Sequence, residues 1–119
     1  MSNQSESYFY PLDGLHRAFE RYEDDGMRGV CGDWEVNKDI SAFPGWWELA
    51  FAEEPVARCV PSEDYGRYGQ FGNIERLNPL ISDKNFTDIC EIAQSVCRCY
   101  RIAPEEYQRI EANNQSRGR

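Results

Sequence analysis

The stretch 44-PGWWELAFAEEPVARCV-60 decides what kind of fold this chain adopts. Apolar side chains alternate with others along its first part, so that Trp47, Leu49 and Phe51 fall on one face of a strand. The turn-like sequence AEEP follows, and the alternation resumes over residues 56–60. This pattern predicts a β-hairpin with a four-residue connection, and therefore an antiparallel sheet in the middle of the chain.

Upstream of the hairpin, the sequence PLDGLHRAFERYEDDG (11–26) predicts a helix. Asp13 is a suitable N-terminal cap, and Gly26 stands where a left-handed C-terminal cap belongs. The sequence GVCGDWEV (29–36) is a weaker strand candidate, because Gly32 interrupts it. The apolar residues of the helix recur at the spacing of a single face, namely Leu15, Ala18, Phe19 and Tyr22.

Downstream, residues 61–79 predict a long irregular segment with room for a short strand. A second helix follows, with Ser82 or Asn85 as its cap. Pro104 fits the first position of a third helix. The buried face of the second helix is expected to comprise Phe86, Ile89, Ala93, Val96 and Tyr100, with Cys90 and Cys97 adjoining.

These elements predict a small α+β fold in a single domain, residues 1–119. The expected order is an N-terminal helix, an antiparallel sheet of three to four strands, a long aromatic and glycine loop, and two C-terminal helices. The helices are expected to cover one face of the sheet. Residues 1–7 and 113–119 are polar and are expected to be flexible.

The chain is acidic, with a net charge of −8 and a pI of about 4.6. Residues 1–60 carry twelve acidic side chains against five basic ones, whereas residues 61–119 carry nine against eight. Such a balance disfavours direct binding to nucleic acid or to anionic membranes, and suits a basic protein partner. The start of the chain lacks a signal-peptide pattern and no apolar run is long enough to cross a bilayer, so a cytoplasmic protein is expected.

Reactive side chains form no catalytic pattern in the sequence. The single histidine, His16, is four residues from Glu20, which predicts an ordinary exposed pair on the helix. Cys97 and Cys99 lack the spacing of a zinc site, and the five cysteines read as small buried hydrophobes. The glycines match no phosphate-binding loop. We therefore expect no catalytic residue, no cofactor and no metal.

Two features indicate a surface that binds another protein. The first helix ends in a group of acids at the negative end of its dipole, where each acid is unfavourable. Solubility alone is an alternative reason for these acids. The predicted acidic binding residues are Glu20, Glu23, Asp24 and Asp25 on this helix, and Glu53 and Glu54 in the hairpin turn.

The second feature is the run EDYGRYGQFGN (63–73), in which an aromatic residue and a glycine recur every three positions. Tyrosine offers rigid contact area and glycine lets a loop adapt, as in many binding loops. The same run also fits rings packed back onto the sheet, or rings that stack on nucleobases. The predicted binding residues here are Glu63, Asp64, Tyr65, Arg67, Tyr68 and Phe71.

Small size, acidic charge and the missing catalytic pattern predict an inhibitor of a basic partner that acts on nucleic acid. Bacterial immunity proteins, antitoxins and phage inhibitors of host defence enzymes share this profile of size and charge. Two alternatives remain open. One is a small-molecule-binding domain or small enzyme with a pocket under the 61–79 loop. The other is a homo-oligomer that associates through its aromatic loop.

Overall fold

The computed structural model describes residues 8–38, 46–62, 72–97 and 100–117. These residues form an α+β fold with three helices and a six-stranded mixed sheet. The helices are α1 (Leu15–Asp25), α2 (Asp83–Val96) and α3 (Pro104–Arg117). The strands are β1 (Arg28–Cys31), β2 (Trp34–Lys38), β3 (Trp47–Phe51), β4 (Glu54–Pro61), β5 (Gly72–Arg76) and β6 (Tyr100–Ile102).

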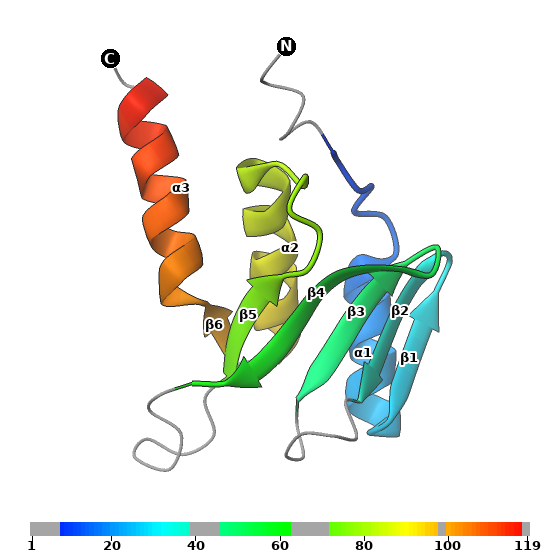
Figure 1. The fold of residues 1–119 in the computed structure, drawn as a ribbon. Coiled ribbons are helices and arrows are strands. Elements are labelled where there is room, and N and C mark those ends of the chain that lie inside the picture. Colours follow the sequence, from blue (N-terminus) through cyan, green and yellow to red (C-terminus); the bar gives the residue numbers. More distant parts are fainter. Residues whose placement is uncertain (1–7, 39–45, 63–71, 98–99, 118–119) are drawn as a thin grey trace.

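The six strands lie side by side in chain order. Neighbouring strands are antiparallel except for β5 and β6, which are parallel. Helices α1 and α2 pack against each other over one face of the sheet, and α3 rises beside β6 (Figure 1). No described helix covers the opposite face of the sheet. The α+β class is thus confirmed, whereas the expected three to four strands were too few.

Strands β1 and β2 form a hairpin where the sequence indicated one weak strand over 29–36. Gly32 and Asp33 connect the two strands, which pair from Cys31↔Trp34 outward. Gly32 has φ of +62°, a conformation typical of glycine in a two-residue hairpin turn. The glycine that we read as an interruption of one strand therefore reverses the chain between two.

The predicted hairpin over 44–60 is present as β3 and β4, with Trp47 and Leu49 buried on the expected face. Its connection has two residues, Ala52 and Glu53, rather than four. The register shifts between Leu49 and Ala50. A bulge of this kind puts two consecutive side chains of the partner strand on one side, so both Val56 and Ala57 are buried.

Strand β5 lies inside the 61–79 segment, and α2 then connects it to the parallel strand β6. Parallel neighbours require such a crossover, and a helix usually supplies it. Tyr100 belongs to β6 because α2 ends at Val96, so its expected place on the helical face is wrong. A three-residue strand carries little pattern of its own, which is why β6 was missed.

Helix α1 buries the predicted stripe of Leu15, Ala18, Phe19 and Tyr22. Gly26 ends the helix with φ of +86°, as expected of a left-handed cap. The predicted cap by Asp13 is wrong, because Gly14 is the N-cap residue and makes no side-chain bond to the helix.

Ser82 is the cap of α2, since its hydroxyl accepts a hydrogen bond from the backbone N–H of Asn85 at 3.1 Å. Asn85, the other predicted cap, is buried and bonds instead to the backbone of Tyr10. Pro104 begins α3 as predicted. The helix continues to Arg117. Residues 1–7 and 118–119 lie outside the described part, and the flexibility of residues 1–7 and 113–119 stays a prediction.

Arg76 fastens β5 to both C-terminal helices. Its side chain is only 4% exposed, and its guanidinium donates to Asp83 Oδ1 at 2.9 Å and to Glu106 Oε1 at 2.8 Å. A third bond goes to the carbonyl of Ile81, at 2.9 Å. A buried charge is tolerated only when it is paired and hydrogen-bonded, and this network meets that condition. The network fixes α3 to the rest of the molecule.

Candidate protein-binding surface

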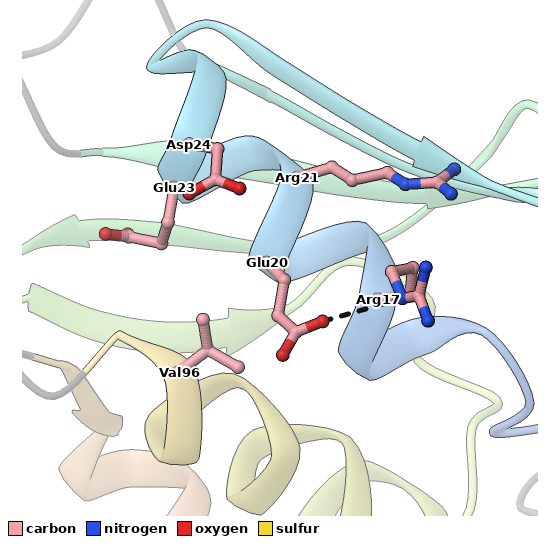
Figure 2. Close-up of a pocket in the computed structure, with 6 residues that line it drawn as sticks. All are labelled: Arg17, Glu20, Arg21, Glu23, Asp24 and Val96. Carbon is pink, nitrogen blue, oxygen red and sulfur yellow. Dashed lines mark ion pairs between the residues drawn. The ribbon is translucent and has the colours of Figure 1, made fainter.

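The outward face of α1 carries the first group of predicted binding residues. Glu20, Glu23 and Asp24 line an open depression of about 540 Å³ together with Arg17, Arg21 and, from α2, Val96 (Figure 2). The helical period turns these residues to solvent because the stripe on the other side of α1 faces the core. The structure therefore brings three of the predicted acids together.

The two arginines of this depression are already engaged. Arg17 Nε lies 3.6 Å from Glu20 Oε1, and His16 Nδ1 lies 3.4 Å from the other oxygen of that carboxylate. Arg21 points away from Val96 (Figure 2), and its guanidinium donates to the carbonyl of Val30 at 2.7 Å. Glu20 is thus balanced by Arg17, whereas Arg21 is bonded to β1.

Glu23 and Asp24 have no cationic partner among the described residues. Glu23 Oε2 accepts a hydrogen bond from the Cys97 thiol at 2.9 Å. Asp24 makes no hydrogen bond or ion pair with any described residue, and no basic side chain occurs in the last turn of α1. Because a helix C-terminus is the negative end of the dipole, both charges disfavour the helix on which they stand.

Asp25, in contrast, has a structural role at the end of α1. Its Oδ2 accepts hydrogen bonds from the backbone N–H groups of Met27 and Arg28, at 3.2 and 3.1 Å. Together with the bond from Arg21 to Val30, these contacts occupy polar backbone groups of Met27 and of β1, which is an edge strand. The sequence pattern did not distinguish Asp25 from its acidic neighbours.

Glu53 and Glu54 are not part of this acidic group. The β3–β4 turn lies at the end of the sheet away from Arg28, the residue at which α1 leads into β1 (Figure 1). Glu54 Oε1 also accepts a hydrogen bond from the Tyr8 hydroxyl at 3.1 Å, which raises the pKa of that tyrosine. These two acids therefore belong to a different part of the surface.

The remaining predicted binding residues, Glu63, Asp64, Tyr65, Arg67, Tyr68 and Phe71, lie outside the described residues. The described residues Pro61 and Gly72, which flank this segment, pair with each other. They lie at the same end of the sheet as the C-terminus of α1, because the strands align Arg58 with Glu48 and Asn37 with Arg28. A pocket under the 61–79 loop stays a prediction for the same reason.

Sequence reasoning missed a second depression, of about 330 Å³, beside α2. Most of the surface exposed in it is apolar, although acidic residues also line it; the lining residues are Leu12, Asp88, Glu91, Ile92 and Ser95. One signal was available, because Ile92 stands outside the predicted buried stripe of α2. Leu12 gave no signal, since its position beside α2 depends on how α1 packs.

Several titratable groups in the described part of the chain are buried, and their pKa values are shifted. Burial raises the pKa values of Cys59 and Cys90, and it raises the pKa of Tyr22 to about 12. Such groups stay protonated near neutral pH, whereas a reactive cysteine needs a lowered pKa. His16 and Glu20 are about half exposed, as expected of an ordinary surface pair.

No group of three or more His, Cys, Asp or Glu side chains within the described residues is placed to hold a metal ion. None of the described helices is both long and apolar enough to cross a membrane. In comparisons with protein families, curated proteins and solved structures, nothing matches this chain.

Proposed function

We propose that this protein acts in the cytoplasm as a stoichiometric inhibitor of a basic protein partner that acts on nucleic acid. One observation carries the proposal: Glu20, Glu23 and Asp24 gather in one open depression, and Glu23 and Asp24 stand at the helix end where negative charge is least favourable. Among the described residues, only Glu20 of these three has a cation beside it, Arg17. The uncompensated charge is therefore turned toward solvent, where a basic surface would neutralise it.

Enzymes and toxins that act on nucleic acid carry positive surfaces for the phosphate backbone. An acidic surface competes for such a site by charge, and it repels nucleic acid itself. Complementary charge also speeds the encounter of two proteins, which suits an inhibitor that must act before damage occurs. Immunity proteins, antitoxins and phage anti-defence proteins would all use the surface in this way.

The binding test compares two triple variants of the full chain. One replaces Glu20, Glu23 and Asp24 with Lys; the control replaces Asp33, Glu48 and Glu111 with Lys. The control residues are exposed acids on other elements, and both variants change net charge equally. Immobilised wild type and control should capture the same basic protein from the native host, identified by mass spectrometry, and the α1 variant should not.

The inhibition test uses that captured protein after purification. Its nuclease or other nucleic-acid-directed activity should fall to zero at about one equivalent of the wild type, and the α1 variant should inhibit far less. Equal loss of binding in both triple variants would show that total charge, rather than this surface, is responsible. A captured protein that stays fully active when bound would refute inhibition.

A further inference from the structure

The two depressions on the helical layer adjoin along α2. Ile92 and Ser95 line one, and the next residue, Val96, lines the other. Helix α1 packs beside α2 and contributes Glu20, Glu23 and Asp24 to the wall of the depression that Val96 lines (Figures 1 and 2). The solvent side of the helix pair is therefore hollowed over consecutive turns of α2. We call the two depressions together the valley between α1 and α2.

The floor of this valley is apolar. Leu12, Ile92 and Val96 are partly buried and pack against the hydrophobic core, yet each keeps an exposed part. Ile92 and Val96 are one helical turn apart, a spacing of about 6 Å along the helix axis. A third helix laid against two packed helices presents apolar residues at that same spacing, every third or fourth position.

The rim of the valley has an excess of acid. Lys84 pairs with Asp88 at 3.2 Å, just as Arg17 pairs with Glu20, and Arg21 is bonded to Val30. Of the acids that line the two depressions, three have no cation beside them among the described residues: Glu23, Asp24 and Glu91. An occupant that suits both floor and rim must be apolar along one stripe and basic beside it.

The uncovered face of the sheet differs in charge. Arg28 Nε lies 2.8 Å from Glu35 Oε2, and Arg58 Nε lies 3.4 Å from Glu75 Oε1. These cross-strand pairs neutralise much of that face, as is usual for a solvated sheet surface. Charge complementarity therefore favours the helical side as the place where a basic partner docks.

We propose that the valley between α1 and α2 binds an amphipathic basic helix of the protein partner. The inference rests on the proposed function and adds the element that the partner inserts. The partner helix lays apolar residues on Leu12, Ile92 and Val96, and its Lys or Arg side chains reach Glu91 on one wall and Glu23 and Asp24 on the other.

The test uses two synthetic basic peptides as probes, each of about 18 residues, or five helical turns. One has Leu at alternating third and fourth positions with Lys and Arg between them; the other is its shuffled isomer, equal in composition and charge. Fluorescence anisotropy measures the binding of each to the full-length protein. We expect the amphipathic peptide to bind at least about tenfold more tightly than the shuffled one.

Three variants locate the binding site. Ile92→Lys and the double variant Asp88→Lys, Glu91→Lys should each weaken the amphipathic peptide about tenfold or more, whereas Val60→Lys on the uncovered sheet face should not. The double variant alters only side chains at the helix surface, so it keeps the test valid if Ile92→Lys does not fold. Circular dichroism checks the fold of each variant.

The outcomes separate the helix site from the proposed function. Equal binding of both peptides, or wild-type binding by the valley variants, overturns the helix site. If the two peptides bind equally and the α1 triple variant abolishes that binding, the helix site is rejected while the acidic surface of the proposed function is supported. If neither peptide binds, the helix site is refuted, and the capture experiment then decides the proposed function independently.

Discussion

Gly29 is a residue of β1 that lies directly against the backbone of α1. A Cβ placed there would overlap backbone atoms of Ala18 and Tyr22, so the helix would have to move away from the sheet. We expect Gly29→Ala to lower the free energy of unfolding by about 2–4 kcal/mol, because overpacking that shifts backbone is costly. Urea unfolding measures this loss.

Gly32→Ala is the matched control for Gly29. Its surroundings are open, but φ of +62° strains any residue that has a Cβ. A loss of about 1 kcal/mol is expected from that strain alone. If the two variants lost equal stability, α1 would have moved aside at little cost, and crowding at Gly29 would not be the larger effect.

Buried protons make the fold sensitive to alkaline pH. Burial raises the pKa of Tyr22 from 10.0 to about 12, and it also raises the pKa of Cys59 above 9.0. The native state therefore keeps protons that the unfolded state releases. The contribution of these groups to the free energy of unfolding is complete below about pH 9 and falls as pH rises from there through about 12.

Urea unfolding with a reductant present should show a decline in the free energy of unfolding from about pH 9 to pH 11. Tyr22→Phe should flatten the part above pH 10; a wild-type stability that is constant over this range would contradict the prediction.

The turn between β3 and β4 is a strained element. Ala52 and Glu53 both have positive φ, 49° and 70°, as a two-residue turn of this kind requires. Alanine and glutamate are poor residues for that conformation, whereas Asn-Gly is the preferred pair. We expect the double change Ala52→Asn, Glu53→Gly to add about 1–2 kcal/mol of stability, measured by thermal unfolding. A lower midpoint would mean that the side chains of this turn have contacts that outweigh the strain.

The same turn shows which features of the secondary structure the sequence patterns could predict and which they could not. Helix α1 and the buried face of β3 were predictable, because their spacing repeats over several residues. The length of the turn was not predictable, since no residue of AEEP (52–55) is typical of the left-handed conformation that Ala52 and Glu53 adopt. Strand β6 was missed because three residues form a strand only by pairing with β5. The Leu12 and Ile92 depression likewise depends on tertiary packing, which single-helix periodicity does not contain.

At the scale of the whole molecule, the two sides of the fold differ in how their charges are compensated. On the uncovered sheet face, arginines and glutamates pair across neighbouring strands. On the helical side, the cations beside the valley are engaged, and Glu23, Asp24 and Glu91 remain without one among the described residues. Of these three, Glu23 and Asp24 stand near the C-terminus of α1, where they disfavour the helix. If binding is the reason these acids persist, stability and association should respond to them in opposite directions.

Asp24→Lys tests that opposition in one substitution. A lysine there complements the helix dipole and stands four residues after Glu20, the favourable order for an ion pair, so stability should rise by about 0.3–1 kcal/mol in urea unfolding. Association with the captured basic partner should instead slow, most strongly at low salt, because rim charges act on the encounter rate. Stopped-flow kinetics at two salt concentrations measures the association rate. Asp24→Asn removes the charge without reversing it, so its association rate should lie between those of the wild type and Asp24→Lys. A variant that is both more stable and equally fast would show that Asp24 lies outside the partner surface, while a less stable variant would show that the dipole does not govern this end of α1.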